Sequence, residues 1–238
     1  MHRELLVRLR DERGFTLVEM MVALAIGLVV STATLAIVIV SVHLSSNYTD
    51  RVDANQTGRL AMEKITQALT SSCVLTNQAP VLAGSTATSL VFYSALNDTP
   101  GPVPSQVTVS IASTQPAPLL MTTQSLTGTP PNWVASSQAP QVYTLAAWAG
   151  QSGSTPMFQY YPYAAGGVVS TTPFTVGANG LTAAQAAATA QVAITYQVLP
   201  TDKWQDTAGR QPVVFSDAVV FRLTPPSSAP SAPNLPCT

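Results

Sequence analysis

The feature that most constrains this chain is an apolar segment, residues 20–42, preceded by a single carboxylate, Glu19. At about 1.5 Å per residue, the segment spans about 34 Å as a helix, which is enough to cross the hydrocarbon core of a membrane. An ionisable side chain at the edge of such a segment costs free energy unless it finds a partner, and it therefore marks function by default. The sequence predicts a membrane helix with a functional glutamate near its start.

The residues before the apolar segment predict its orientation. Residues 1–14 carry four arginines and three acidic residues; the arginines are Arg3, Arg8, Arg10 and Arg13. Basic residues beside an apolar segment favour the cytoplasmic side. We therefore expect a single-pass protein of the cytoplasmic membrane, with its amino terminus inside and the residues after the segment outside the cytoplasm.

The junction between leader and apolar segment reads Gly14-Phe15-Thr16-Leu17-Val18-Glu19. A short charged leader, this junction and about twenty apolar residues resemble the class III signal peptide of type IV prepilins and type II secretion pseudopilins. The resemblance implies that a prepilin peptidase cuts between Gly14 and Phe15 and that the same enzyme family methylates Phe15. It also implies that Glu19, the fifth residue after the cut, acts in assembly.

The same resemblance implies a function and partners. The chain would be a minor pilin or pseudopilin, low in abundance and associated with the tip of a type IV pilus or a type II secretion pseudopilus. Its filament would lie at the cell surface or in the periplasm. Its partners would be prepilin peptidase, other pilins or pseudopilins, the inner-membrane assembly platform and membrane lipid. Ala23, Ala25 and Gly27 would permit close approach of neighbouring helices.

Two other readings of the amino terminus remain open. An ordinary secretory signal could be cut near Ala33, but this would leave Glu19 inside its apolar core and divide a continuous apolar run. A plain signal anchor explains the run but neither the Gly14–Phe15 junction nor the glutamate.

The helix is predicted to continue beyond the membrane. Apolar residues recur every three or four positions on about the same face up to Cys73, and the set comprises Leu44, Tyr48, Val52, Met62, Ile65, Leu69 and Cys73. We expect one helix over residues 17–72, bent or loosened at Gly58 without ending there.

After Cys73 the pattern changes to short strands. Apolar residues alternate with polar ones over 90–95, 107–111 and 192–198, and further strands are expected at 119–123, 142–148, 157–161 and 213–223. Thr182 and Gln185 form a capping-box pattern that opens a short helix through Ala190. These elements predict an α+β, pilin-like fold in which the long helix packs on an antiparallel sheet.

The expected organisation has five parts. Residues 1–14 are the leader, 15–43 the transmembrane and assembly half of the helix, and 44–73 its ectodomain half. Residues 74–224 form a β-rich ectodomain. Residues 225–238 form a proline-rich tail, which we expect to be extended.

The order of elements in the ectodomain carries a second, looser resemblance. The aromatic segment 158–161, a short helix, an alternating strand and the segment 217–223 resemble W-type minor pilins and J-type pseudopilins. The last strand departs from that pattern at Phe221-Arg222-Leu223. Core packing explains the aromatic residues Phe158, Tyr160 and Tyr161 better than binding does.

The chain has two cysteines, Cys73 and Cys237, both on the expected outer side of the membrane. An oxidising compartment favours a disulfide between them. The alternative is a buried free thiol at Cys73 and an unpaired Cys237.

No pattern for chemistry is visible. The two histidines, His2 and His43, lie in the leader and at the membrane edge, and the chain lacks a nucleophile elbow, metal-ligand spacing and a phosphate loop. Asp202 and Asp206 have the polarity of a calcium loop without its spacing, so a solvated turn explains them better. We expect no enzymatic activity, no cofactor and no metal.

The alternative function is that of a ligand-binding tip pilin, for adhesion or DNA uptake. Asp98 is the one charged residue between Ile65 and Thr201. A surface with so little charge disfavours nucleic acid as a partner but leaves adhesion to sugar or protein open.

Overall fold

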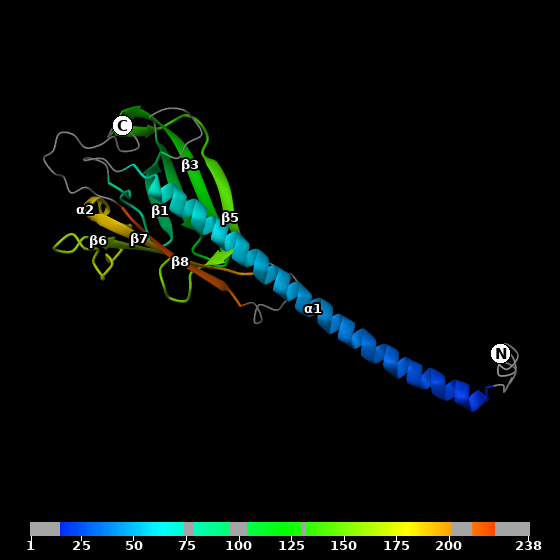
Figure 1. Cartoon of the computed structure of the whole chain (residues 1–238). Coiled ribbons are helices and arrows are strands. Elements are labelled where there is room, and N and C mark those ends of the chain that lie inside the picture. Colours follow the sequence, from blue (N-terminus) through cyan, green and yellow to red (C-terminus); the bar gives the residue numbers. More distant parts are fainter. Residues whose placement is uncertain (1–14, 74–78, 96–103, 130–131, 201–210, 222–238) are drawn as a thin grey trace, which may run out of the picture. The chain divides into compact units, whose positions relative to one another are not determined.

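The computed structural model describes residues 15–73, 79–95, 104–129, 132–200 and 211–221. They fall into two units, one up to Thr49 and one from Asp50. The predicted leader, the proline-rich tail, Asp202 and Asp206 lie outside the described residues. A single helix, α1 (Leu17–Thr70), runs through both units and ends close to the predicted boundary (Figure 1).

The second unit contains an eight-stranded sheet in which every pairing is antiparallel (Figure 1). Its first strands are β1 (Ser89–Ser94), β2 (Ser105–Ile111), β3 (Ala117–Thr129), β4 (Asn132–Ala135) and β5 (Gln141–Gly150). The others are β6 (Phe158–Pro162), β7 (Thr189–Val198) and β8 (Val213–Val220), and a short helix, α2 (Ala183–Ala187), precedes β7. The expected α+β arrangement is confirmed.

The strand order is β1-β2-β3-β5-β7-β6, with β4 paired to β3 and β8 paired to β7. β8 pairs with β7 from Gln191 to Val198. The other edge of β7 is shared: β6 pairs with its first part and β5 with Gln197 and Val198 at its end. This sharing joins the β1–β5 strands to the β6–β8 strands in one sheet.

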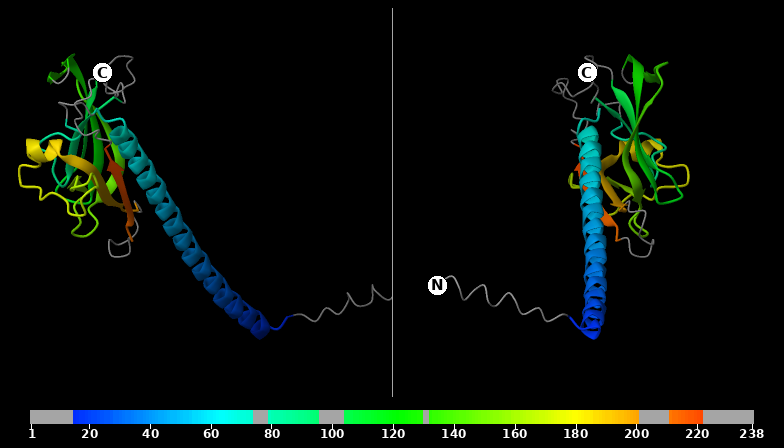
Figure 2. Two further views of the ribbon diagram at one scale, coloured as in Figure 1. Left: turned by 60° about the vertical axis from the view of Figure 1, so that its left-hand side comes forward. Right: turned by 90° about the vertical axis from the view of Figure 1, so that its right-hand side faces the viewer.

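One face of the sheet packs on the carboxyl-terminal part of α1, which is the cyan part in Figure 2. The alternation predicted for three strands is confirmed, because their inward side chains are buried: Leu90, Phe92, Val107, Val109, Ile111, Val192, Ile194, Tyr196 and Val198. The helix contributes a matching stripe, formed by Ala54, Gly58, Ala61, Met62, Ile65, Ala68 and Leu69. Burying this apolar surface stabilises the body by about 25 cal/mol per Å².

The predicted helix stripe is wrong in its first part. Leu44, Tyr48 and Val52 are 53%, 69% and 55% exposed. A row of residues four apart drifts by about 40° per step around an α-helix, so it leaves the face that is buried farther along. The buried stripe instead begins at Ala54 and consists of small residues as far as Ala61.

Gly58 was expected to bend or loosen the helix, but its role is close packing. A Cβ atom at this position would overlap the ring of Phe215 on β8. The Tyr196 hydroxyl of β7 donates a hydrogen bond to the Gly58 carbonyl over 2.7 Å, and the rings of Tyr196 and Phe215 stack with their centroids 5.6 Å apart. Burial raises the pKa of Tyr196 well above its usual range, so the hydroxyl keeps the proton that it donates.

Some predicted boundaries shift. The capping box at Thr182 and Gln185 is present, but α2 ends at Ala187 and not at Ala190, because β7 already begins at Thr189 and pairs with β6. β3 extends well beyond the predicted 119–123, since β2, β4 and β5 all pair with it. β8 ends at Val220, and the predicted end at Leu223 lies outside the described residues.

Candidate functional site

The start of α1 places Phe15 and Glu19 four positions apart at the predicted mature amino terminus. Phe15 and Thr16 precede the first helical residue, Leu17, and Phe15 is 79% exposed. The Thr16 hydroxyl accepts a hydrogen bond from the backbone N–H of Glu19 over 3.3 Å. Thr16 is therefore the N-cap and Glu19 the third helical residue, a threonine-to-glutamate spacing typical of capping boxes. The sequence analysis missed this second meaning of the motif.

The cap uses the backbone of Glu19 and leaves its side chain available. Glu19 is exposed, and its carboxylate accepts no hydrogen bond from the described residues. A negative charge in the first turn is favoured by the helix dipole. The free energy of that interaction is small compared with the cost of placing a carboxylate in lipid. The Glu19 carboxylate therefore still needs an opposite charge to stabilise it there.

The helix beyond Glu19 has the length and composition of a membrane span. Its most apolar window has a mean hydropathy of 2.6, and none of that window is buried within the chain. Every residue from Phe15 to Ser46 is exposed. Apolar side chains in every direction around a helix are typical of a segment surrounded by lipid or by other helices.

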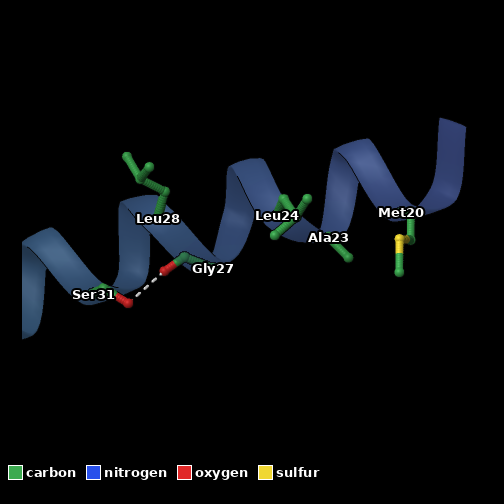
Figure 3. Close-up of a pocket in the computed structure, with 6 residues that line it drawn as sticks. All are labelled: Met20, Ala23, Leu24, Gly27, Leu28 and Ser31. Atoms are coloured by element: carbon green, nitrogen blue, oxygen red, sulfur yellow. Dashed lines mark hydrogen bonds between the residues drawn. The ribbon is translucent and has the colours of Figure 1, made fainter. Parts of the chain in front are cut away.

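A shallow groove runs along this part of α1, lined by Met20, Ala23, Leu24, Gly27, Leu28 and Ser31 (Figure 3). The small residues Ala23, Gly27 and Ser31 recur every four positions and make the floor. The Ser31 hydroxyl donates to the Gly27 carbonyl over 2.7 Å, so this polar group is already satisfied within the helix. Spacing of this kind lets a second helix approach closely in a membrane.

Gly27 has no packing role among the described residues, since a Cβ atom there would meet none of them within 4 Å. The structure distinguishes among Ala23, Ala25 and Gly27, the three small residues that were predicted to permit close approach of helices. Ala23 and Gly27 line the groove, whereas Ala25, two residues from each, does not.

Only one of the remaining predicted site residues lies among the described residues. Gly14 and Cys237 lie outside the described residues. Cys73 lies three residues after the end of α1, is 1% exposed, and donates its backbone N–H to the Tyr93 carbonyl over 2.8 Å. The structure thus fixes the position of one cysteine at the junction of α1 and β1, and the pairing with Cys237 stays a prediction.

The aromatic segment of β6 belongs to the core, as expected. Phe158 and Tyr160 are buried, and the Tyr160 hydroxyl donates to the Thr86 carbonyl over 2.8 Å. Tyr161 is half-buried. Within the described ranges, no three His, Cys, Asp or Glu side chains gather in a way that could hold a metal ion.

Comparison with known proteins identifies the amino-terminal segment. Residues 9–35 match the family described as the prokaryotic N-terminal methylation motif, and this range includes Gly14, Phe15 and Glu19 as well as the groove on α1. Searches of curated proteins and of solved structures each found no match to the chain. The chain therefore carries the class III signal of type IV prepilins, placed at the start of an apolar helix whose other end packs on an antiparallel sheet.

Proposed function

We propose that this protein is a minor pilin or pseudopilin that joins a type IV pilus or a type II secretion pseudopilus through α1. The observation that carries the proposal is the motif over residues 9–35 at the head of a helix whose first part is exposed on all sides. A helix of this kind is compatible with lipid before assembly and with a bundle of neighbouring helices afterwards. Contacts between two different faces of neighbouring subunits, repeated by a rotation that does not close, build filaments and not rings.

The order of elements supports the choice of a minor subunit. The strand β6, the short helix α2 and the strands β7 and β8 follow one another as in the W-type and J-type proteins that the sequence resembles. We propose a low-abundance position at the filament tip, where α1 joins the neighbouring subunits and the uncharged sheet surface faces outward.

Glu19 would set the register of assembly. Cleavage before Phe15 creates a positively charged amine, and a carboxylate in a medium of low dielectric constant is best stabilised by such a charge on a neighbouring subunit. The Glu19 carboxylate has no hydrogen-bond partner among the described residues, which leaves it available for that contact.

Processing should be visible in the intact mass of membrane-purified protein. We expect the loss of residues 1–14 and the gain of one methyl group on Phe15. Gly14→Ala should slow processing, because the peptidase site needs a small residue with a flexible backbone. A mature terminus near Ala33 or Thr34 would favour an ordinary secretory signal and contradict the proposal.

Glu19→Ala should leave membrane insertion intact, because it removes a charge that is costly in lipid. It should lower incorporation into filaments at least tenfold, because it also removes the register contact. Incorporation is measured by immunoblotting sheared filaments against the membrane fraction. Thr16→Ala is the matched control: it removes the hydroxyl that caps the helix, at a cost of about 1 kcal/mol, and keeps the carboxylate. Equal incorporation of Glu19→Ala and the unchanged protein would refute the register role.

We also propose a disulfide between Cys73 and Cys237. Cys73 is held at the junction of α1 and β1, so the bridge would tie the end of the chain to the point where the helix meets the sheet. Closing so long a loop is worth about 4–5 kcal/mol in the chain-entropy model. Peptide mapping without reduction should recover the linked pair, whereas labelling of both thiols in native protein would exclude it.

A further inference from the structure

The middle of α1 belongs neither to the predicted membrane span nor to the packed part of the helix. The apolar run ends at Val42, and the buried residues of the helix begin at Ala54. We term residues 45–53 the connecting segment, and none of them is buried. Opening this segment would therefore uncover little apolar surface, so burial contributes little to keeping it helical.

The composition of the connecting segment disfavours a helix. Residues 45–50 read Ser-Ser-Asn-Tyr-Thr-Asp, and all six are weak helix formers. Residues 59–64 of the packed part read Arg-Leu-Ala-Met-Glu-Lys, and all six are strong ones. The Thr49 hydroxyl also donates to the Ser45 carbonyl over 3.0 Å, a contact that slightly destabilises helices and often bends them. One continuous helix thus contains a weak part directly before a strong one.

Opening can stay confined to the connecting segment. All seven buried residues of α1 lie at Ala54 or beyond it, and so does the Gly58 carbonyl that accepts the hydrogen bond from Tyr196. On the other side, unpaired backbone groups are costly in lipid, so the apolar run up to Val42 stays helical. The body and the membrane span therefore both keep their structure when the segment opens.

The connecting segment contains one of the three basic residues of α1. Arg51 lies in it, whereas Arg59 and Lys64 lie in the packed part, and all three are exposed. An endoprotease binds its substrate as an extended chain, so a helix must open before it is cut. Opening at Arg59 or Lys64 would pull the buried stripe off the sheet, and this costs a large share of the stability of the body.

We propose that the connecting segment opens locally in the folded protein, and that an extracytoplasmic endoprotease with an acidic pocket for a basic side chain cuts between Arg51 and Val52. Water adds across this peptide bond and leaves a carboxylate on Arg51 and an amine on Val52. The product, residues 52–238, keeps every buried residue of α1 and leaves the membrane as a folded body. The inference goes beyond the proposed function, because it requires the membrane span but no filament.

The first test is limited digestion of the full chain in detergent micelles with trypsin, which cuts after arginine and lysine. Mass spectrometry quantifies the new amino terminus that each of the three basic residues of α1 gives at early times. Cutting after Arg51 should be at least about a hundredfold faster than after Arg59 or Lys64, because only the latter two require unpacking of the body. Similar rates at the three residues would overturn the inference.

Helix-strengthening variants show whether opening controls the rate. Ser45→Ala, Ser46→Ala and Thr49→Ala together should slow cutting after Arg51 by about tenfold, because alanine is the strongest helix former. Gln67→Ala with Thr70→Ala, at exposed positions of the packed part, should change the rate by less than about twofold.

A synthetic peptide of residues 44–57 separates opening from recognition by the protease. With the same three alanines it should be cut as fast as the unchanged peptide, since it is too short to form a stable helix. If the three alanines leave the rate in the full chain unchanged, the helix does not control cutting and the inference is wrong.

Hydrogen exchange measures the opening without a protease. In the full chain, the backbone amides of the connecting segment should exchange at least about a hundredfold faster than those of residues 59–69. The three alanines should slow this exchange by about the same factor as they slow cutting. Equal protection of the two parts of α1 would contradict local opening.

Arg51→Gln tests the release in cells. It keeps a polar side chain and removes the charge that the acidic pocket needs, so soluble body that begins at Val52 should fall at least about tenfold. Arg59→Gln is the matched control and should leave its amount unchanged. Equal amounts from the two variants, or no soluble body from the unchanged protein, would overturn the release. The mass of the membrane-bound form reports cleavage after Gly14 separately, and failure of that cleavage would contradict only the proposed function.

Discussion

Gly58→Ala is expected to lower the free energy of unfolding of the body by about 3 kcal/mol, although replacing glycine by alanine inside a helix ordinarily stabilises it by up to about 1 kcal/mol. The sign reverses because the added Cβ atom overlaps the ring of Phe215. Moving α1 away from the ring to relieve the overlap also stretches the hydrogen bond from Tyr196 to the Gly58 carbonyl, which contributes about 1 kcal/mol. Thermal unfolding should show a midpoint about 6–12 °C lower for a body of this size.

The control for helix propensity is Asn55→Ala, an exposed position on the same helix where alanine should be neutral or slightly stabilising. The control for the overlap is a double-mutant cycle with Phe215→Leu. Combining it with Gly58→Ala should recover part of the loss, because the smaller side chain leaves room for the Cβ atom. If Gly58→Ala raises the midpoint as Asn55→Ala does, the close approach of α1 to β8 is wrong.

The contrast between Gly58 and the strands shows what a sequence pattern can predict. The alternation of Val192, Ile194, Tyr196 and Val198 identifies a strand buried on one face, because the period of two is a local property of the chain. Gly58 is a packing residue only because Phe215 and Tyr196 lie opposite it, and they come from strands far along the chain. A local pattern contains no information on contacts between distant parts of the chain, so Gly58 was predicted to bend the helix.

The helix stripe failed for a related reason. Leu44, Tyr48 and Val52 are apolar and well spaced, whereas the residues that contact the sheet first are Ala54, Gly58 and Ala61. Hydropathy marks large apolar residues, but close contact of a helix with a sheet requires small ones. The end of α2 was misplaced because pairing with β6 draws Thr189 into β7, and tertiary pairing overrides local helix propensity.

The candidate site was more accessible to sequence analysis than the fold. Gly14, Phe15 and Glu19 lie within six consecutive residues and form a motif that depends on order along the chain. The match over residues 9–35 confirms the motif, and the roles of the three residues stay predictions. The groove of Ala23, Gly27 and Ser31 could have been found from its spacing of four.

The last prediction concerns the part of α1 that the sheet needs. A fragment beginning at Ser45 keeps every buried residue of the helix, since these begin at Ala54, and should be a soluble, cooperatively folding, mainly β body with one helix. A fragment beginning at Val74 loses Met62, Ile65 and Leu69, each worth about 1.5–3 kcal/mol of burial.

This loss is comparable to the whole stability of an ordinary domain, about 5–15 kcal/mol. It also exposes the inward side chains of the strands, including Phe92, Ile194 and Tyr196, so the shorter fragment should aggregate. Both fragments should carry Cys237→Ser, and the longer one also Cys73→Ser, so that the two fragments do not differ in disulfide bonding. Circular dichroism, size-exclusion chromatography and thermal unfolding compare the two. If the Val74 fragment is monomeric and unfolds as cooperatively as the Ser45 fragment, the helix contributes nothing to the core. The pilin-like interpretation of the body would then be wrong, although the amino-terminal motif would still be correctly identified.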